Sequence, residues 1–259
     1  MAERPALIER IFDTKEYNEG GVYVIKFCKN GEWQSVTIDD YFPCFPNGGP
    51  MFSRSNGNEL WVLMIEKAYA KVHGGYKAIS GGLPYEGLMD LTGCPTISYN
   101  FKDQVVQQMI DQGKLWELLK YYDSEGYIIT GGTPPETFKD EAKEEEGFYE
   151  EQKQGSGLIP GHAYAVIISK EAKGNRLMNL RNPWGGFEWD GDWSDNSPLW
   201  TEEMKDLMKP NLDGDDGTFW MCWEDFVANF DSLDVCRVRN WDEIRIRGRF
   251  LRFADTENQ

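Results

Sequence analysis

The chain has 259 residues, of which 40% are hydrophobic and 14% aromatic, enough to bury the core of one large domain or two small lobes. Its 27 basic and 44 acidic residues give a net charge of −17, which disfavours a nucleic-acid surface and suits hard cations such as Ca²⁺. No apolar run reaches the roughly 20 residues of a membrane span, and the N-terminus lacks a signal peptide's apolar stretch. We therefore expect a cytoplasmic protein with no membrane span and no nucleic-acid partner.

The first third of the chain predicts helices around one hairpin. Residues 4–12 carry Pro5 in a first turn and an apolar stripe, which predicts a helix. Two alternating segments, 21–27 and 33–38, flank Asn30-Gly31, the strongest short-range hairpin signal. Apolar residues at three- and four-residue spacing predict a helix over 58–72 that ends at a glycine pair. A short helix is expected over 85–91.

From about residue 94 the pattern favours a sheet. The remaining expected elements are a helix over 103–122, interrupted in pattern by Gly113, strands at 127–130, 163–168, 176–181, 219–222 and 233–238, and helices at 200–208 and 223–230. Residues 139–153 form an acidic run that predicts a solvated loop. The sum is an α+β chain with lobes at 1–93 and 94–240, and residues 241–259 begin a following segment or tail.

One histidine and one asparagine stand at the ends of two expected strands. His162 precedes the strand at 163–168, and Asn182 follows the strand at 176–181, twenty positions later. Paired as a hairpin, these strands would let the Asn182 carboxamide hold the His162 imidazole, which is the base and orienter of a thiol protease. Alone, His162 could be a satisfied core histidine and Asn182 could start an Asx turn. The other histidine, His73, follows a helix and is assigned no role.

Several motifs, taken in order, resemble those of the calpain family of cysteine proteases. They are Asn58-Glu59-Leu60-Trp61, Ile65-Glu66-Lys67-Ala68-Tyr69-Ala70-Lys71, Ser80-Gly81-Gly82, Leu91-Thr92-Gly93, Gly161-His162-Ala163-Tyr164, Arg181-Asn182-Pro183-Trp184-Gly185, Glu188-Trp189-Asp190-Gly191-Asp192-Trp193-Ser194-Asp195 and Asp216-Gly217-Thr218-Phe219-Trp220. The resemblance covers about residues 3 to 240, and the N-terminal half is most similar to the small-optic-lobes branch.

The resemblance implies a papain-like, two-lobed fold with a helical, incomplete first lobe and an antiparallel-sheet second lobe. It implies Cys-His-Asn endopeptidase activity on protein substrates, with His162 and Asn182 catalytic. It also implies that Trp184, which alone could be plain core, shields the His–Asn pair.

The resemblance further implies calcium bound in each lobe. Glu188, Asp195 and Asp216 resemble ligands of the second-lobe ion, and Glu59 resembles the one first-lobe ligand retained; singly, each is an ordinary surface charge. Thr218 stands where many family members have a second carboxylate, which weakens the set. An EF-hand loop from residue 213 is rejected, because Thr218 occupies its sixth position, where glycine is needed.

The chain departs from the family pattern at the nucleophile. The family's cysteine opens a helix in a Gly-Asp-Cys-Trp context, upstream of the residues matched here. The chain has an odd number of cysteines, and none of them forms the closely spaced pairs typical of a zinc site. They suggest free thiols in a reducing compartment. The five are Cys28, Cys44, Cys94, Cys222 and Cys236. None fits the nucleophile position, and we expect no helix start behind the two in strands, Cys28 and Cys222. We therefore expect this polypeptide to be inactive alone; the alternative is a non-catalytic calpain homologue that binds peptides or partners.

Overall fold

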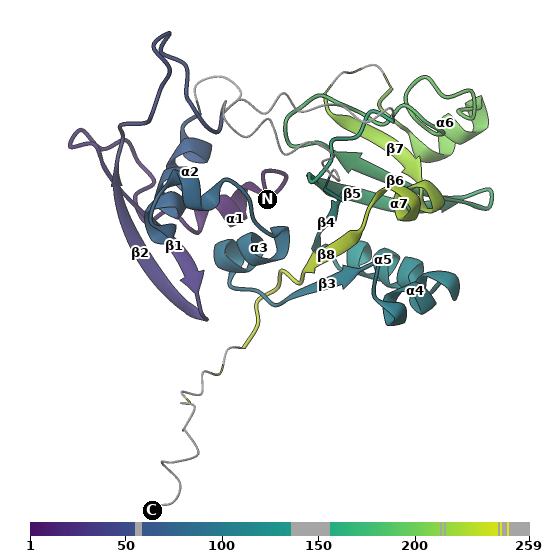
Figure 1. Ribbon diagram of the computed structural model, residues 1–259, viewed down its shortest axis with the longest axis horizontal. Helices are drawn as coiled ribbons and strands as arrows, with labels where there is room; N and C mark the ends of the chain where they lie inside the picture. The colour runs from purple at the N-terminus through teal and green to yellow at the C-terminus, as the bar shows by residue number, and fades with distance from the viewer. Residues whose placement is uncertain are drawn as a thin grey trace, which may run out of the picture.

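The computed structural model describes residues 1–54, 59–135, 156–212, 214, 216–242, 244 and 248. The described residues form two neighbouring groups of elements, one around a hairpin and one around a larger sheet (Figure 1). All strand pairs are antiparallel, so the predicted α+β class is confirmed. The predictions for residues 139–153 and for most of 241–259 lie outside the described residues. No helix in the described part combines the length and apolarity needed to cross a bilayer.

The first group is built on the predicted hairpin. Its elements are α1 (Pro5–Glu9), β1 (Val22–Lys29), β2 (Glu32–Asp39), α2 (Trp61–His73), the 3₁₀ helix η1 (Tyr76–Ile79) and α3 (Pro84–Thr92). The Asn30-Gly31 turn joins β1 to β2 as expected. Met64 and Ala68 of α2 pack with Ile25 and Phe27 of β1 to form a small core. Helix α1 is shorter than predicted, and α2 begins three residues later than predicted.

The second group contains a six-stranded sheet with the order β3-β8-β4-β5-β6-β7. Its elements are β3 (Thr96–Asn100), α4 (Gln104–Asp111), α5 (Lys114–Ser124), β4 (Ile128–Gly132), β5 (Ala163–Ala172), β6 (Asn175–Arg181), α6 (Glu202–Met208), β7 (Thr218–Cys222), α7 (Trp223–Asn229) and β8 (Ser232–Cys236). Strand β3 was not predicted. The single helix predicted over 103–122 is wrong: Gly113 adopts a φ of +70°, which ends α4 and starts α5.

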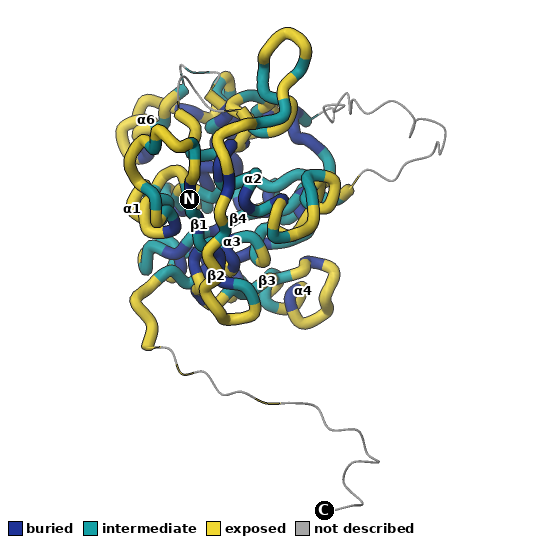
Figure 2. Tube along the Cα trace, turned by 90° about the vertical axis from the view of Figure 1, so that its left-hand side faces the viewer, coloured by how far each residue is buried: buried dark blue, intermediate teal, exposed yellow. Residues whose placement is uncertain are grey.

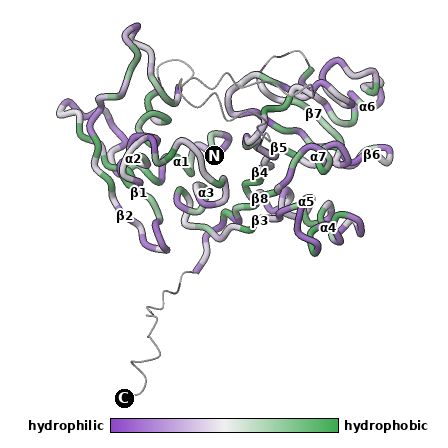
Figure 3. Tube along the Cα trace, viewed as in Figure 1, coloured by the Kyte–Doolittle hydropathy of each residue, from purple (hydrophilic) through white to green (hydrophobic). Residues whose placement is uncertain are grey.

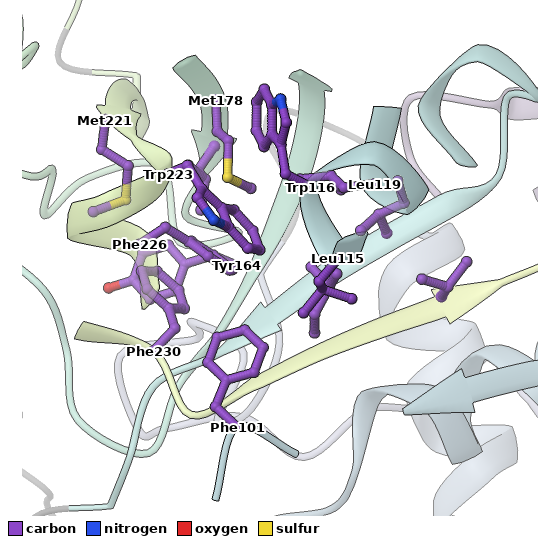
Figure 4. Close-up of a cluster of buried hydrophobic side chains, with 14 of the residues drawn as sticks. Phe101, Leu115, Trp116, Leu119, Tyr164, Met178, Met221, Trp223, Phe226 and Phe230 are labelled. Carbon is purple, nitrogen blue, oxygen red and sulfur yellow. The ribbon is translucent and has the colours of Figure 1, made fainter. Parts of the chain in front are cut away.

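Helices α5 and α7 cover one face of this sheet. Figure 4 shows aromatic and aliphatic side chains of both helices meeting those of the strands, including Tyr164 of β5 and Met178 of β6. Trp116 and Trp223 pack with ring centroids 5.6 Å apart. Burying side chains of this size contributes about 1.5–3 kcal/mol each relative to exposure, so this cluster dominates the stability of the group. Hydrophobic residues recur along the strands, while many peripheral loop positions are hydrophilic (Figure 3).

The opposite face of the sheet is divided between two neighbours. At β6 and β7, α6 and a tryptophan cluster cover it, with Trp200 packed edge-on against Trp193 and Trp220. At β8, Cys236 packs with Leu88 of α3, which joins the two groups. Buried positions concentrate inside both groups and exposed positions along their outer loops (Figure 2). The strand end that carries His162 therefore belongs to a sheet held firmly on both sides.

Candidate active site

The predicted pairing of His162 and Asn182 is present. Strands β5 and β6 run antiparallel with Ala165 opposite Arg181, so the residue before β5 and the residue after β6 meet at one end of the sheet. His162 Nε2 lies 2.9 Å from Asn182 Oδ1. The Asn182 side chain is fully buried, whereas the imidazole is partly exposed. The sheet register alone therefore brings the two side chains together.

The contacts of Asn182 fix which nitrogen of His162 carries the proton. Asn182 Nδ2 donates to the carbonyl oxygen of Gly186 at 2.6 Å, and its Oδ1 accepts from the backbone N–H of Trp184 at 3.1 Å. The oxygen of the amide must then face the imidazole, so Nε2 of the neutral ring donates. Nδ1 is left with the lone pair and is the atom that can accept a proton from a substrate or nucleophile.

Burial lowers the pKa of His162, and the hydrogen bond to Asn182 opposes that shift. The ring is therefore neutral at pH 7 and suited to act as a general base. In the described structure, its hydrogen-bond and ring contacts are Asn182, Trp184 and Tyr164, and none of these carries a charge at neutral pH. Burial of the imidazole, rather than a charged neighbour, is thus what lowers the pKa of His162.

The Trp184 indole lies over the imidazole. The two ring centroids are 3.9 Å apart, and 47% of the Trp184 surface is exposed. Tyr164 also meets the imidazole edge-on, with ring centroids 5.1 Å apart. Trp184 therefore packs against the imidazole from a half-exposed position and is not a core residue.

Comparison with known proteins identifies the family. The sequence matches the calpain family cysteine protease domain over residues 1–237. The chain belongs to the calpain family of cysteine proteases. It is 42% identical over 233 residues to calpain-type cysteine protease DEK1 of Arabidopsis thaliana, covering 89% of this chain and 10% of that protein. It is 40% identical over 235 residues to ADL1 of Oryza sativa subsp. japonica (90% and 10%), and 34% identical over 232 residues to human calpain-9 (84% and 30%).

The chain thus spans about a tenth to a third of the length of these relatives. Its α+β architecture is that of a papain-like calpain protease core, as predicted. The His162–Asn182 pair lies within the matched residues, so the structure and the family agree on a protease core.

In this calpain core a tight turn holds Asn182 in place. The Asn182 N–H donates to the carbonyl oxygen of Gly217 at 2.8 Å, and the Gly217 N–H donates to Glu188 Oε1 at 2.8 Å. A Cβ atom on Gly217 would lie 2.8 Å from the Asn182 carbonyl oxygen and 2.9 Å from Gly185 Cα. Two backbone segments therefore approach each other more closely than any side chain at residue 217 would permit.

Two of the predicted second-lobe carboxylates meet at this turn. Glu188 accepts from Gly217, and Asp216 Oδ1 accepts from the backbone N–H of Thr218 at 2.9 Å. Asp195 is partly buried and follows Ser194, whose backbone N–H donates to Gly191. Within the described residues no group of three or more His, Cys, Asp or Glu side chains is arranged to hold a metal ion.

The first-lobe candidate Glu59 lies apart from these residues. It is exposed, accepts from the indole N–H of Trp61 at 3.1 Å and lines a cavity of about 730 Å³ beside α1. The cavity is lined by apolar side chains, including Pro5, Ile8 and Phe12, and also by the carboxylates of Glu9 and Glu16. Within the described residues, Glu59 nonetheless forms part of no group of three or more His, Cys, Asp or Glu side chains that could hold a metal ion.

The five thiols lie in other parts of the chain: Cys28 in β1, Cys44 in the loop after β2, Cys94 before β3, Cys222 at the end of β7 and Cys236 at the end of β8. The expectation of no helix start behind Cys222 is wrong, because its sulfur accepts from Asp225 N and caps α7. The Cys222 thiol nevertheless remains protonated, since burial is the main cause that raises its pKa to about 12.

Two residues of the site escaped sequence reasoning. Thr133 bonds to the backbone of His162, and Tyr164 bonds to that of Ile159. Thr133 follows an ordinary strand, and its partners lie 26 and 29 residues away. In the sequence, Tyr164 stands out only as the last residue of the motif Gly161-His162-Ala163-Tyr164. Local patterns carry no signal for such contacts.

Proposed function

We propose that this chain supplies the general base and its orienting amide to a calcium-dependent cysteine endopeptidase that cleaves protein substrates inside the cell. The observation that carries the proposal is the 2.9 Å contact between His162 Nε2 and Asn182 Oδ1, with Nδ1 directed by that contact to act as the base. Family membership supports the same reading, since calpains are cysteine proteases.

The proposed reaction follows from this tautomer. His162 Nδ1 accepts the proton of a cysteine thiol, and the thiolate attacks the carbonyl carbon of the scissile peptide. The imidazolium then gives that proton to the leaving amine, and a water molecule, deprotonated by His162, releases the acyl group. Throughout these steps, the hydrogen bond to Asn182 keeps the proton on Nε2 of His162 and holds the imidazole in one orientation. Trp184 limits the access of water to the pair.

The nucleophile in this proposal comes from a segment outside the present sequence. The positions of the five cysteines support this, because the imidazole contacts are Asn182, Tyr164 and Trp184 and include no cysteine of the described residues. A test uses the chain alone and the chain joined to an upstream segment that carries a Gly-Asp-Cys-Trp context, assayed with Ca²⁺ on a fluorogenic peptide and on casein.

We expect activity only in the joined protein. His162→Ala should reduce kcat by about 10²-fold or more, in line with the usual contribution of a general base. His73→Ala is the matched control, because it removes the other histidine and should leave kcat unchanged. A joined protein that folds and binds substrate without cleaving it would contradict the proposal.

Calcium dependence is the second part of the proposal. Glu188 and Asp216 would hold the ion together with backbone oxygens of their turn, a donor set of oxygen atoms that suits Ca²⁺. A bound ion would supply positive charge to this acidic turn. Titration calorimetry should show binding, and Ca²⁺ should raise the melting temperature by mass action. Glu188→Gln should weaken both effects, whereas Glu202→Gln on α6 removes the same charge elsewhere and should not.

The alternative is a non-catalytic calpain homologue that binds peptides. This alternative accounts equally well for the placement of all five thiols on other elements. In that case the joined protein would bind peptides without hydrolysis, and His162→Ala would leave the binding affinity unchanged.

A further inference from the structure

The chain between β4 and β5 is pinned at its two ends. On one side stand Thr133 and Pro134, directly after β4; on the other stand residues 159–162, directly before β5. The Thr133 N–H donates to the His162 carbonyl oxygen at 2.9 Å, and the Gly161 N–H donates to the Pro134 carbonyl oxygen at 2.9 Å. These bonds extend the β4–β5 ladder beyond Gly132 and Ala163. The backbone of His162 is therefore held by ladder hydrogen bonds although it lies before the first residue of β5.

The side chain of Thr133 adds a second set of bonds at the same place. Its Oγ1 accepts from the His162 N–H at 2.9 Å and donates to the Ile159 carbonyl oxygen at 2.6 Å. Thr133 is 5% exposed and Ile159 is 2% exposed, so little water competes for these groups. A single hydroxyl thus satisfies a donor on His162 and an acceptor on the segment that leads to it.

Tyr164 of β5 also binds the segment that leads to His162. Its hydroxyl accepts from the Ile159 N–H at 2.8 Å, and its ring meets the His162 ring edge-on. Tyr164 is fully buried and packs on Phe219 and Phe230. Both polar backbone groups of Ile159 are therefore bound by side chains, one by Thr133 and the other by Tyr164.

We propose that Thr133 is the positioning residue of His162, and that its hydroxyl, with Tyr164 as its support, sets the direction in which the imidazole leaves the backbone. This inference rests on the proposed role of His162 as base. A valine at residue 133 has the same shape but leaves the His162 N–H and the Ile159 carbonyl without their buried partner, which is costly enough to make the segment shift. A serine keeps the hydroxyl.

The test needs no nucleophile, because the imidazole itself is observed. The chain contains two histidines, so isotope labelling of histidine gives two ring spectra, and His73 in the other group of elements serves as the internal control. We compare the chain with Thr133→Val, Thr133→Ser and Tyr164→Phe. The readouts are the exchange-protected Nε2–H signal of His162 and its titration by NMR.

Thr133→Val should lose the protected Nε2–H signal, and the pKa of His162 should rise toward its ordinary value as the ring becomes hydrated. Tyr164→Phe should shift both readouts in the same direction, and Thr133→Ser should retain those of the parent chain. The ring signals of His73 should keep the same positions in all four proteins at a fixed pH, and dispersed backbone amide signals should show that the variants are folded.

Parent-like His162 signals in Thr133→Val would overturn the inference, as would Thr133→Ser behaving like Thr133→Val. If Thr133→Val does not fold, Tyr164→Phe decides by the same criterion. These NMR readouts do not depend on catalysis. The expected changes can therefore be observed even if the peptidase assay fails, which separates the proposal on Thr133 from the proposed peptidase function.

Discussion

Gly217 gives the sharpest prediction about the site. Its carbonyl oxygen accepts from Asn182 N–H, and its φ is +81°, a conformation that L residues adopt at a cost of about 1–2 kcal/mol. Gly174, in the turn between β5 and β6, has nearly the same φ of +80°, but a Cβ there would meet nothing within 4 Å. The two glycines differ in their surroundings and not in their φ.

The magnitude follows from this comparison. Gly174→Ala should cost only the conformational term, about 1–2 kcal/mol of unfolding free energy. Gly217→Ala adds contacts of 2.8 Å and 2.9 Å with backbone atoms, which cannot rotate away as a side chain can. Overpacking of this kind costs about 1–3 kcal/mol more, for a total of about 2–5 kcal/mol. The extra cost comes from displacing Asn182 or Gly185.

Urea unfolding of the two variants measures the difference, and the NMR signals of the His162 ring show where the strain goes. We expect Gly217→Ala to be the less stable variant and to perturb the His162 ring, while Gly174→Ala leaves the ring unchanged. Equal losses of stability in the two variants, with an unchanged His162 spectrum in both, would refute the close-approach argument.

Three further predictions concern buried polar groups. Asp90 is 3% exposed and accepts from Lys29 Nζ at 2.6 Å and Tyr69 OH at 2.8 Å, so Asp90→Ala should cost about 2–4 kcal/mol in urea unfolding and Asp90→Asn, which keeps an acceptor, less. Because folding lowers the pKa of His162, its contribution to stability is complete above its ordinary pKa of 6.5 and is lost as the pH falls below that value. His162→Gln should remove that part of the pH dependence; an unchanged slope would count against it. NMR titration should show the pKa of His162 lowered further in Asn182→Ala, which deletes the hydrogen bond that raises it, and raised in Asn182→Asp.

The features that could be predicted from the sequence are those determined by residues close together along the chain. The hairpin of β1 and β2 followed from the Asn30-Gly31 turn, and the His162–Asn182 contact followed from the pairing of the two predicted strands that these residues flank. Strand β3 was missed because its pairing partner β8 lies more than 130 residues further on, and residues 96–100 carry too short a pattern to show it.

The supports of the site lay beyond sequence reasoning for the same reason. The role of Thr133 depends on Ile159 and His162, which approach it only after β4 and β5 pair. The close approach at Gly217 depends on the turn after β6 meeting the turn before β7. A sequence can thus indicate the reacting groups of a calpain core, whereas the residues that hold them emerge from the fold.

The backbone of Gly217 links the proposed calcium site to Asn182, whose side chain is the proposed orienting amide. Its N–H donates to Glu188, and its C=O accepts from Asn182, so two hydrogen bonds lead from a proposed calcium ligand to the residue that orients the base. The two bonds belong to neighbouring peptide groups that share the Gly217 Cα, so a displacement of this one residue alters both bonds together. A change at Glu188 that removes its acceptor should therefore reach His162, while a change that removes only its charge should act mainly on ion binding. The proposed metal site and the proposed base are thus separate sites that are linked through one backbone residue, Gly217.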